Sequence, residues 1–126
     1  MKSSPVLARV AALAFFLTAA LHTSAYPTIA ALAKAGPPDL RPVVPMVWLA
    51  FSLMLVVVGL IVAANASAPP SRYRMLTLIF AGLFAFGSAT LQIIFLGFIP
   101  PVAILCVDGA LAIAAALISG VHVASA

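Results

Sequence analysis

Hydrophobic residues fill four long stretches of this chain, and short segments rich in proline or charged residues separate them. A membrane-spanning helix needs about 20 predominantly apolar residues, and each stretch is long enough to supply one. The pattern predicts helical spans over residues 6–33, 43–64, 75–98 and 102–123. Loops as short as the ones between them make consecutive helices antiparallel neighbours. We therefore expect one membrane domain over residues 1–126, an all-α integral membrane protein built as an up-down four-transmembrane-helix bundle.

Prolines mark most of the breaks, because proline lacks the backbone N–H and its ring clashes with the preceding helical turn. We expect a loop, with no helix running through it, where four of them cluster at Pro37, Pro38, Pro42 and Pro45. Pro100 and Pro101 are expected in the first turn of the last span, where no helical hydrogen bond is lost. Pro27 falls inside the first span and predicts a bend near its outer end.

The start of the chain has a second interpretation. Lys2 and Arg9 flank the beginning of an apolar core, and the small residues at 23–25 resemble a signal-peptidase site, with cleavage after Ala25. Cleavage would leave three spans. Against it, helix-favouring apolar sequence continues to Ala33. Both interpretations stay open at this point.

The amino-acid composition indicates that this chain resides in a lipid bilayer. Hydrophobic residues make up 66% of it and charged residues 6%, whereas a soluble domain has about a quarter charged residues. The basic residues are scattered and form no nucleic-acid-binding stripe. Near the span ends, the amino terminus and the second loop hold four of them, and the first loop holds the other two: Lys2, Arg9, Arg72 and Arg74 against Lys34 and Arg41. The positive-inside rule then predicts cytoplasmic termini, and we expect a bacterial cytoplasmic membrane.

Asp108 is the only acidic residue within the four apolar stretches. A carboxylate in hydrocarbon costs several kcal/mol, on the order of 3 by insertion scales, unless a partner compensates it. Asp108 is therefore the first candidate for a functional residue.

Other polar residues are predicted to lie at the depth of Asp108. With a rise of about 1.5 Å per residue, His22 lies roughly 24 Å from the inner start of the first span and Asp108 about 9 Å below the outer end of the fourth. Gln92 falls at a similar height, and Tyr26 shares a helix face with His22. These residues predict a polar pocket in the outer third of the bilayer, formed by His22, Tyr26, Gln92 and Asp108.

Trp48 and Phe51, near the outer end of the second span, are expected to line this pocket. The alternative is a structural clamp, because polar side chains also join membrane helices simply by hydrogen bonding across them. For Gln92 alone a clamp is favoured. For Asp108 a functional role is favoured, since an ionisable group is a costly way to hold helices together.

These features favour an accessory or assembly subunit of a membrane complex. The alternative is a proton-coupled small-molecule carrier or binder that uses the pocket around Asp108 and His22.

We expect no enzyme, metal site or cofactor, because the chain has no nucleophile motif, phosphate loop or closely spaced ligand pair. The single cysteine, Cys106, lies in an apolar stretch and is expected to act as a small hydrophobic residue. The expected partners are the lipid bilayer and further copies of the chain or other membrane subunits, with a small-molecule ligand left open and nucleic acid excluded.

Overall fold

The computed structural model describes residues 3–97 and 99–124, and the side chains of residues 5–94, 97 and 99–119. Within these residues all regular structure is helical: α1 (Ser3–Ser24), α2 (Tyr26–Ala35), α3 (Leu40–Ala66), α4 (Arg72–Leu96) and α5 (Pro100–Ala124). Four helical segments are long and apolar enough to cross a membrane: Pro5–Ala35, Leu40–Ala66, Arg72–Ile94 and Pro100–Ser119. The prediction of an all-α chain with four long apolar helices is confirmed.

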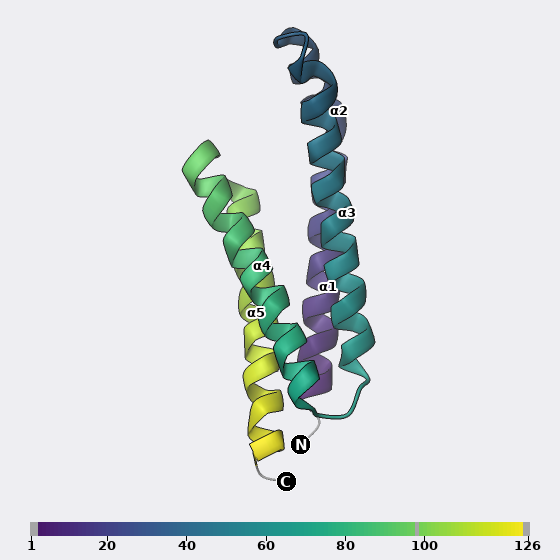
Figure 1. Cartoon of the computed structure of the whole chain (residues 1–126), viewed down its shortest axis with the longest axis vertical. Coiled ribbons are helices and arrows are strands. Elements are labelled where there is room, and N and C mark those ends of the chain that lie inside the picture. Colours follow the sequence, from purple (N-terminus) through teal and green to yellow (C-terminus); the bar gives the residue numbers. More distant parts are fainter. Residues whose placement is uncertain (1–2, 98, 125–126) are drawn as a thin grey trace.

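The helices form two antiparallel hairpins (Figure 1). One hairpin joins α1 and α2 to α3, and the other joins α4 to α5. The hairpins meet chiefly through α1 and α5, near the end of the molecule that holds both termini, and they diverge toward the other end. There α2 and the start of α3 extend beyond the α4–α5 turn (Figure 1). The bundle is therefore closed at one end and open at the other.

Small residues allow the two helices of the second hairpin to approach closely. A Cβ atom built on Gly82 of α4 would lie 3.1 Å from the carbonyl oxygen of Gly109 in α5, and one built on Gly109 would lie 3.2 Å from the carbonyl oxygen of Gly82. Buried alanines flank this contact on both helices: Ala81, Ala85, Ala89, Ala112 and Ala116. Backbones this close are typical of helix pairs with small residues at the interface.

The proline-rich segment differs from the sequence prediction. Helix α3 begins at Leu40 and includes Pro42 and Pro45, so the expectation of a loop through all four prolines is wrong for these two. Pro42 lies in the first turn, where backbone N–H groups have no helical partner to lose. Pro45 leaves only the carbonyl of Arg41 without its helical donor, near the end of the hairpin. The connection is thereby reduced to residues 36–39.

The other helix ends agree with their local sequence. The first long helix is interrupted at Ala25, between α1 and α2 and two residues before Pro27. Helix α4 ends before Gly97, which has φ 76° and ψ −173°, a conformation that is essentially restricted to glycine. Residue 98, the expected end of that span, lies outside the described residues. Helix α5 begins at Pro100, as expected.

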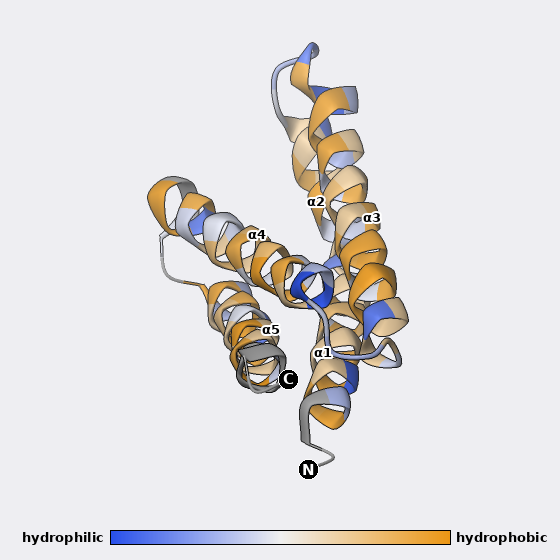
Figure 2. Cartoon of the chain, turned by 60° about the horizontal axis from the view of Figure 1, so that its bottom comes forward, coloured by the Kyte–Doolittle hydropathy of each residue, from blue (hydrophilic) through white to orange (hydrophobic). Residues whose placement is uncertain are grey.

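Large apolar side chains are exposed on all the long helices, and hydrophobic positions run along the length of the molecule (Figure 2). Leu13, Phe80 and Leu117, on three different helices, are 57%, 69% and 65% exposed. The hydrophilic positions lie mainly near the helix ends and loops (Figure 2). Soluble monomeric proteins rarely expose continuous apolar surface of this extent.

Candidate functional site

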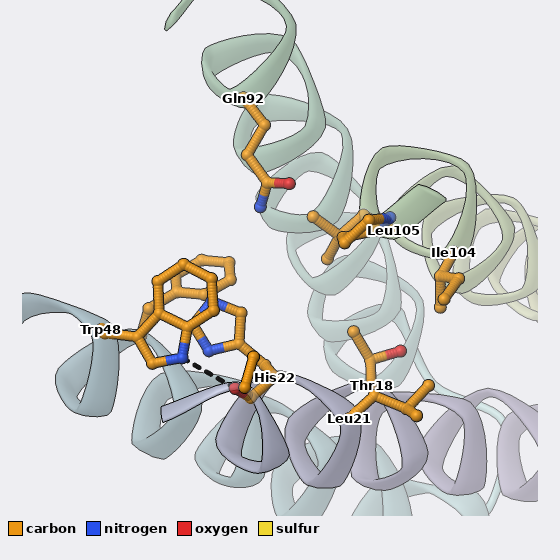
Figure 3. A pocket seen from close by; sticks show the side chains of 10 residues that line it. Thr18, Leu21, His22, Trp48, Gln92, Ile104 and Leu105 are labelled. Carbon is orange, nitrogen blue, oxygen red and sulfur yellow. Dashed lines mark hydrogen bonds between the residues drawn. The ribbon is translucent and has the colours of Figure 1, made fainter. Parts of the chain in front are cut away.

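A cavity of about 100 Å³ is lined by residues of both hairpins. Helix α1 contributes Thr18 and His22 to its lining, and α3 contributes Trp48 and Phe51. Gln92 of α4 and apolar residues of α5 close the opposite side (Figure 3). The cavity thus touches all four long helices, and its surface is almost entirely apolar.

The His22 side chain is held between two aromatic rings of α3. Its imidazole stacks on Trp48 with ring centroids 3.8 Å apart and an interplanar angle of 12°. Phe51 meets the same imidazole edge to face, with centroids 4.9 Å apart. Nδ1 of His22 lies 2.9 Å from Oγ of Ser52, within hydrogen-bonding distance. Three residues of α3 therefore fix the orientation of one ring of α1.

The backbone of His22 is bound to the same helix. The indole Nε1 of Trp48 donates a hydrogen bond of 2.7 Å to the carbonyl oxygen of His22 (Figure 3). This carbonyl lies in the last turn of α1, where it also accepts the backbone N–H of Ala25 at 3.3 Å, and the indole supplies a second donor from outside the helix. Trp48 and Ser52 can both reach His22 because residues four apart share a helix face. The contact ties the helix break to α3.

Ser52 did not figure among the predicted site residues. It has the only side-chain hydroxyl within residues 43–64, and it lies one helical turn after Trp48. An isolated polar residue in an apolar span, aligned with the span's tryptophan, is the signal that would have identified it.

Asp108 contacts Thr18 rather than His22. A hydrogen bond of 2.7 Å joins the Thr18 hydroxyl to Oδ2 of Asp108, and Asp108 is only 1% exposed. Asp108 is absent from the described residues that line the cavity, whereas Thr18 is among them. The carboxyl is thus one side chain away from the cavity and joins α1 of the first hairpin to α5 of the second.

Gln92 and Tyr26 have different surroundings. The Gln92 amide is directed from α4 across the cavity, with its nitrogen toward the His22–Trp48 pair (Figure 3). Its Oε1 is buried and has no hydrogen-bond partner among the described residues. Tyr26 begins α2 after the break and is half-buried, and it is not part of the cavity lining that the structure describes.

Of the four residues predicted to form a pocket, the structure therefore places two, His22 and Gln92, on one cavity. Trp48 and Phe51 line it as well. Asp108 is connected to the cavity through Thr18, and Tyr26 lies apart from it. The described residues contain no group of three or more His, Cys, Asp or Glu side chains arranged to hold a metal ion. The arrangement is suited to binding, since the described lining residues combine aromatic and aliphatic walls with few polar atoms.

No protein-family model matches this chain, and neither the curated proteins nor the solved structures contain a significant match to it.

Proposed function

We propose that this chain is a multi-pass membrane protein, with both termini in the cytoplasm, that serves as an accessory or assembly subunit of a larger membrane complex. The apolar exterior supports residence in a bilayer, because such a surface would associate in water. Arg9 and Arg72 are exposed near the end that holds the termini, and this distribution supports the orientation.

The observation that carries the subunit role is the projecting part of the first hairpin. The 31-residue helical segment Pro5–Ala35 would be about 46 Å long at about 1.5 Å per residue, well above the roughly 30 Å of a hydrocarbon core. Helix α2 packs mainly against α3, and Leu32 and Met46 on this hairpin are 66% and 63% exposed. The projecting α2–α3 hairpin and the shorter α4–α5 hairpin form a step that fits an apolar helix of a partner subunit.

The polar residues support a scaffold as well. Asp108 is bonded to Thr18, and His22 is held by Ser52 and Trp48, so these groups serve contacts between helices. A proton-coupled carrier, the alternative, would need Asp108 within reach of water or of a transported molecule. Its burial and its position behind Thr18 favour the structural role.

Purification of the full chain in mild detergent tests the proposal. We expect a stoichiometric membrane partner to copurify, and Leu32→Trp or Met46→Trp to release it by blocking close helix packing. Leu117→Trp is the matched control, because Leu117 is 65% exposed but lies on α5. Recovery of the chain alone, as a monomer or homodimer, would contradict the accessory role.

A further inference from the structure

The cavity between the hairpins has the features of a binding site for an uncharged molecule. The described residues of its lining include no Asp, Glu, Lys or Arg. A charged ligand would lose its hydration there without gaining a counter-charge. The occupant is therefore neutral and largely apolar.

The walls favour a flat ring. Trp48 and Phe51 line one side of the cavity, and Leu105 of α5 faces them from the other hairpin. Aromatic side chains present flat faces on which a second ring can stack. The imidazole of His22 covers one face of Trp48 and contacts Phe51 by its edge, so both rings are held in place and a ligand ring can use only the surface that they leave uncovered.

One hydrogen-bond donor is directed into this apolar space. The amide nitrogen of Gln92 points toward the His22–Trp48 pair (Figure 3), while the amide oxygen Oε1 is buried without a hydrogen-bond partner among the described residues. A polar group surrounded by apolar walls favours a ligand that completes its hydrogen bonding and rejects one that does not. An amide nitrogen donates, so the matching ligand atom is a neutral acceptor such as a carbonyl oxygen.

Cavity size limits the occupant further. At about 100 Å³ the cavity is smaller than the roughly 150 Å³ of an apolar cavity that encloses benzene. It can accept the carbonyl end of a single ring, while the rest of the molecule stays outside between the diverging hairpins.

We propose that this cavity binds an uncharged aryl or quinone-type ring carbonyl, with the carbonyl oxygen accepting a hydrogen bond from Gln92 and the ring lying against Trp48 and Phe51. The site is independent of the accessory role, because it lies between the hairpins and does not use the projecting surface. Two sources share this chemistry: a small free aryl ketone, and a membrane lipid that carries the same ring on a long tail.

Trp48 is the only tryptophan in the chain, so in a nanodisc whose scaffold protein lacks tryptophan the emission comes from a ring that lines this cavity. Acetophenone quenches tryptophan on contact, and we expect saturable quenching of the full-length protein in lipid nanodiscs. Ethylbenzene has nearly the same shape but no carbonyl, and its affinity follows from its ability to restore the emission. We expect ethylbenzene to bind more weakly than acetophenone by a factor of up to about ten, because one hydrogen bond of ordinary strength supplies a factor of this size. Ligand uptake by empty nanodiscs corrects for partitioning.

Variants locate the donor. In Gln92→Leu the ratio of the affinities for acetophenone and ethylbenzene should fall to about one. Thr90→Val, a change at an exposed residue of the same helix, should leave this ratio unchanged. Non-saturable quenching, equal binding of both probes, or a preference that survives Gln92→Leu would each overturn the proposal. The comparison of probes in the unaltered protein decides the matter even if Gln92→Leu fails to fold. Tighter binding of 4-dodecylacetophenone than of acetophenone, after the same correction, assigns the site to a tailed lipid, and equal binding assigns it to a free ketone.

Discussion

Thr18 and Asp108, 90 residues apart in the chain, are joined by a hydrogen bond of 2.7 Å that connects the two hairpins. The Thr18 hydroxyl also lies 3.0 Å from the carbonyl oxygen of Ala14, yet it carries only one hydrogen. A protonated carboxyl satisfies both contacts, because Asp108 can then donate to Thr18 and Thr18 can donate to Ala14. Oδ1 of Asp108, buried and without a partner among the described residues, is also less costly on a neutral group.

This arrangement predicts that Asp108→Asn is tolerated. The asparagine amide can donate to Thr18 as the protonated carboxyl does, so we expect a loss of less than about 1 kcal/mol in the free energy of unfolding. Thr18→Val leaves the buried carboxyl without its partner and should cost about 1–3 kcal/mol. Reversible unfolding in mixed micelles measures both, and the double variant gives the coupling between them. If Asp108→Asn lowers the free energy of unfolding as much as Thr18→Val does, the Asp108 carboxyl is ionised and accepts the hydrogen bond from Thr18 instead of donating one.

The contact between Gly82 and Gly109 provides a second test. An added methyl group at Gly82 would come within 2.6 Å of the Ile113 side chain and 3.1 Å of the Gly109 carbonyl oxygen. Side chains can move, but the backbone oxygen cannot without separating α4 from α5. We expect Gly82→Ala and Gly109→Ala to cost about 1–3 kcal/mol each, the usual penalty of overpacking.

Gly87 on the same helix supplies the control, because a Cβ atom there would meet nothing within 4 Å. Gly87→Ala should leave stability unchanged or raise it slightly, since alanine favours helix more than glycine does. Equal losses at positions 82 and 87 would mean that the two helices do not cross at the glycines.

The sequence predicts where the helices begin and end far better than which face each helix directs toward its neighbours. Apolar length and prolines place four long helices, because the bilayer length and the missing proline donor act locally along the chain. Depth follows from residue counting, and the structure places His22 and Gln92, which were predicted at a similar depth, on one cavity. The face that each helix turns to its neighbours depends on side-chain packing between distant segments. The prediction grouped Asp108 with His22 in one pocket, whereas the structure bonds Asp108 to Thr18, one turn earlier on the same helix.

Tyr26 shows a related limit. The prediction placed it beside His22 from the four-residue spacing, within a span over residues 6–33 that was expected to bend near Pro27. The structure ends α1 at Ser24 and begins α2 at Tyr26, and Tyr26 is not among the described residues that line the cavity. Pro27 predicts that a bend exists, but the new direction of the chain depends on contacts such as the bond from Trp48 to the His22 carbonyl.

That bond predicts the effect of Trp48→Phe. Phenylalanine keeps an aromatic ring against His22 but removes the indole N–H, so the His22 carbonyl loses a donor near the helix break. We expect a loss of about 0.5–1.5 kcal/mol, together with faster hydrogen exchange of the amides of α2. Tyr73→Phe, at a residue that is 84% exposed, should change neither quantity. Unchanged exchange in Trp48→Phe would show that the indole bond does not anchor the α1–α2 joint.

Membrane orientation is testable by cysteine labelling, because Cys106 is the only cysteine in the chain. In a Cys106→Ala background, single cysteines replace Pro38 in the α2–α3 turn or Ser67 in the α3–α4 loop, both at exposed positions. The basic residues favour a cytoplasmic α3–α4 loop. A membrane-impermeant maleimide added to intact cells should therefore label Pro38→Cys, and it should label Ser67→Cys only after the cells are opened. The α3–α4 loop is the more informative site because Arg74 contributes little exposed charge there. Its guanidinium is buried and donates to the Ala68 carbonyl. Arg72 and Arg9 therefore supply the exposed positive charge at this end. The reverse labelling pattern would place the termini outside and show that these exposed arginines are too few to set the orientation.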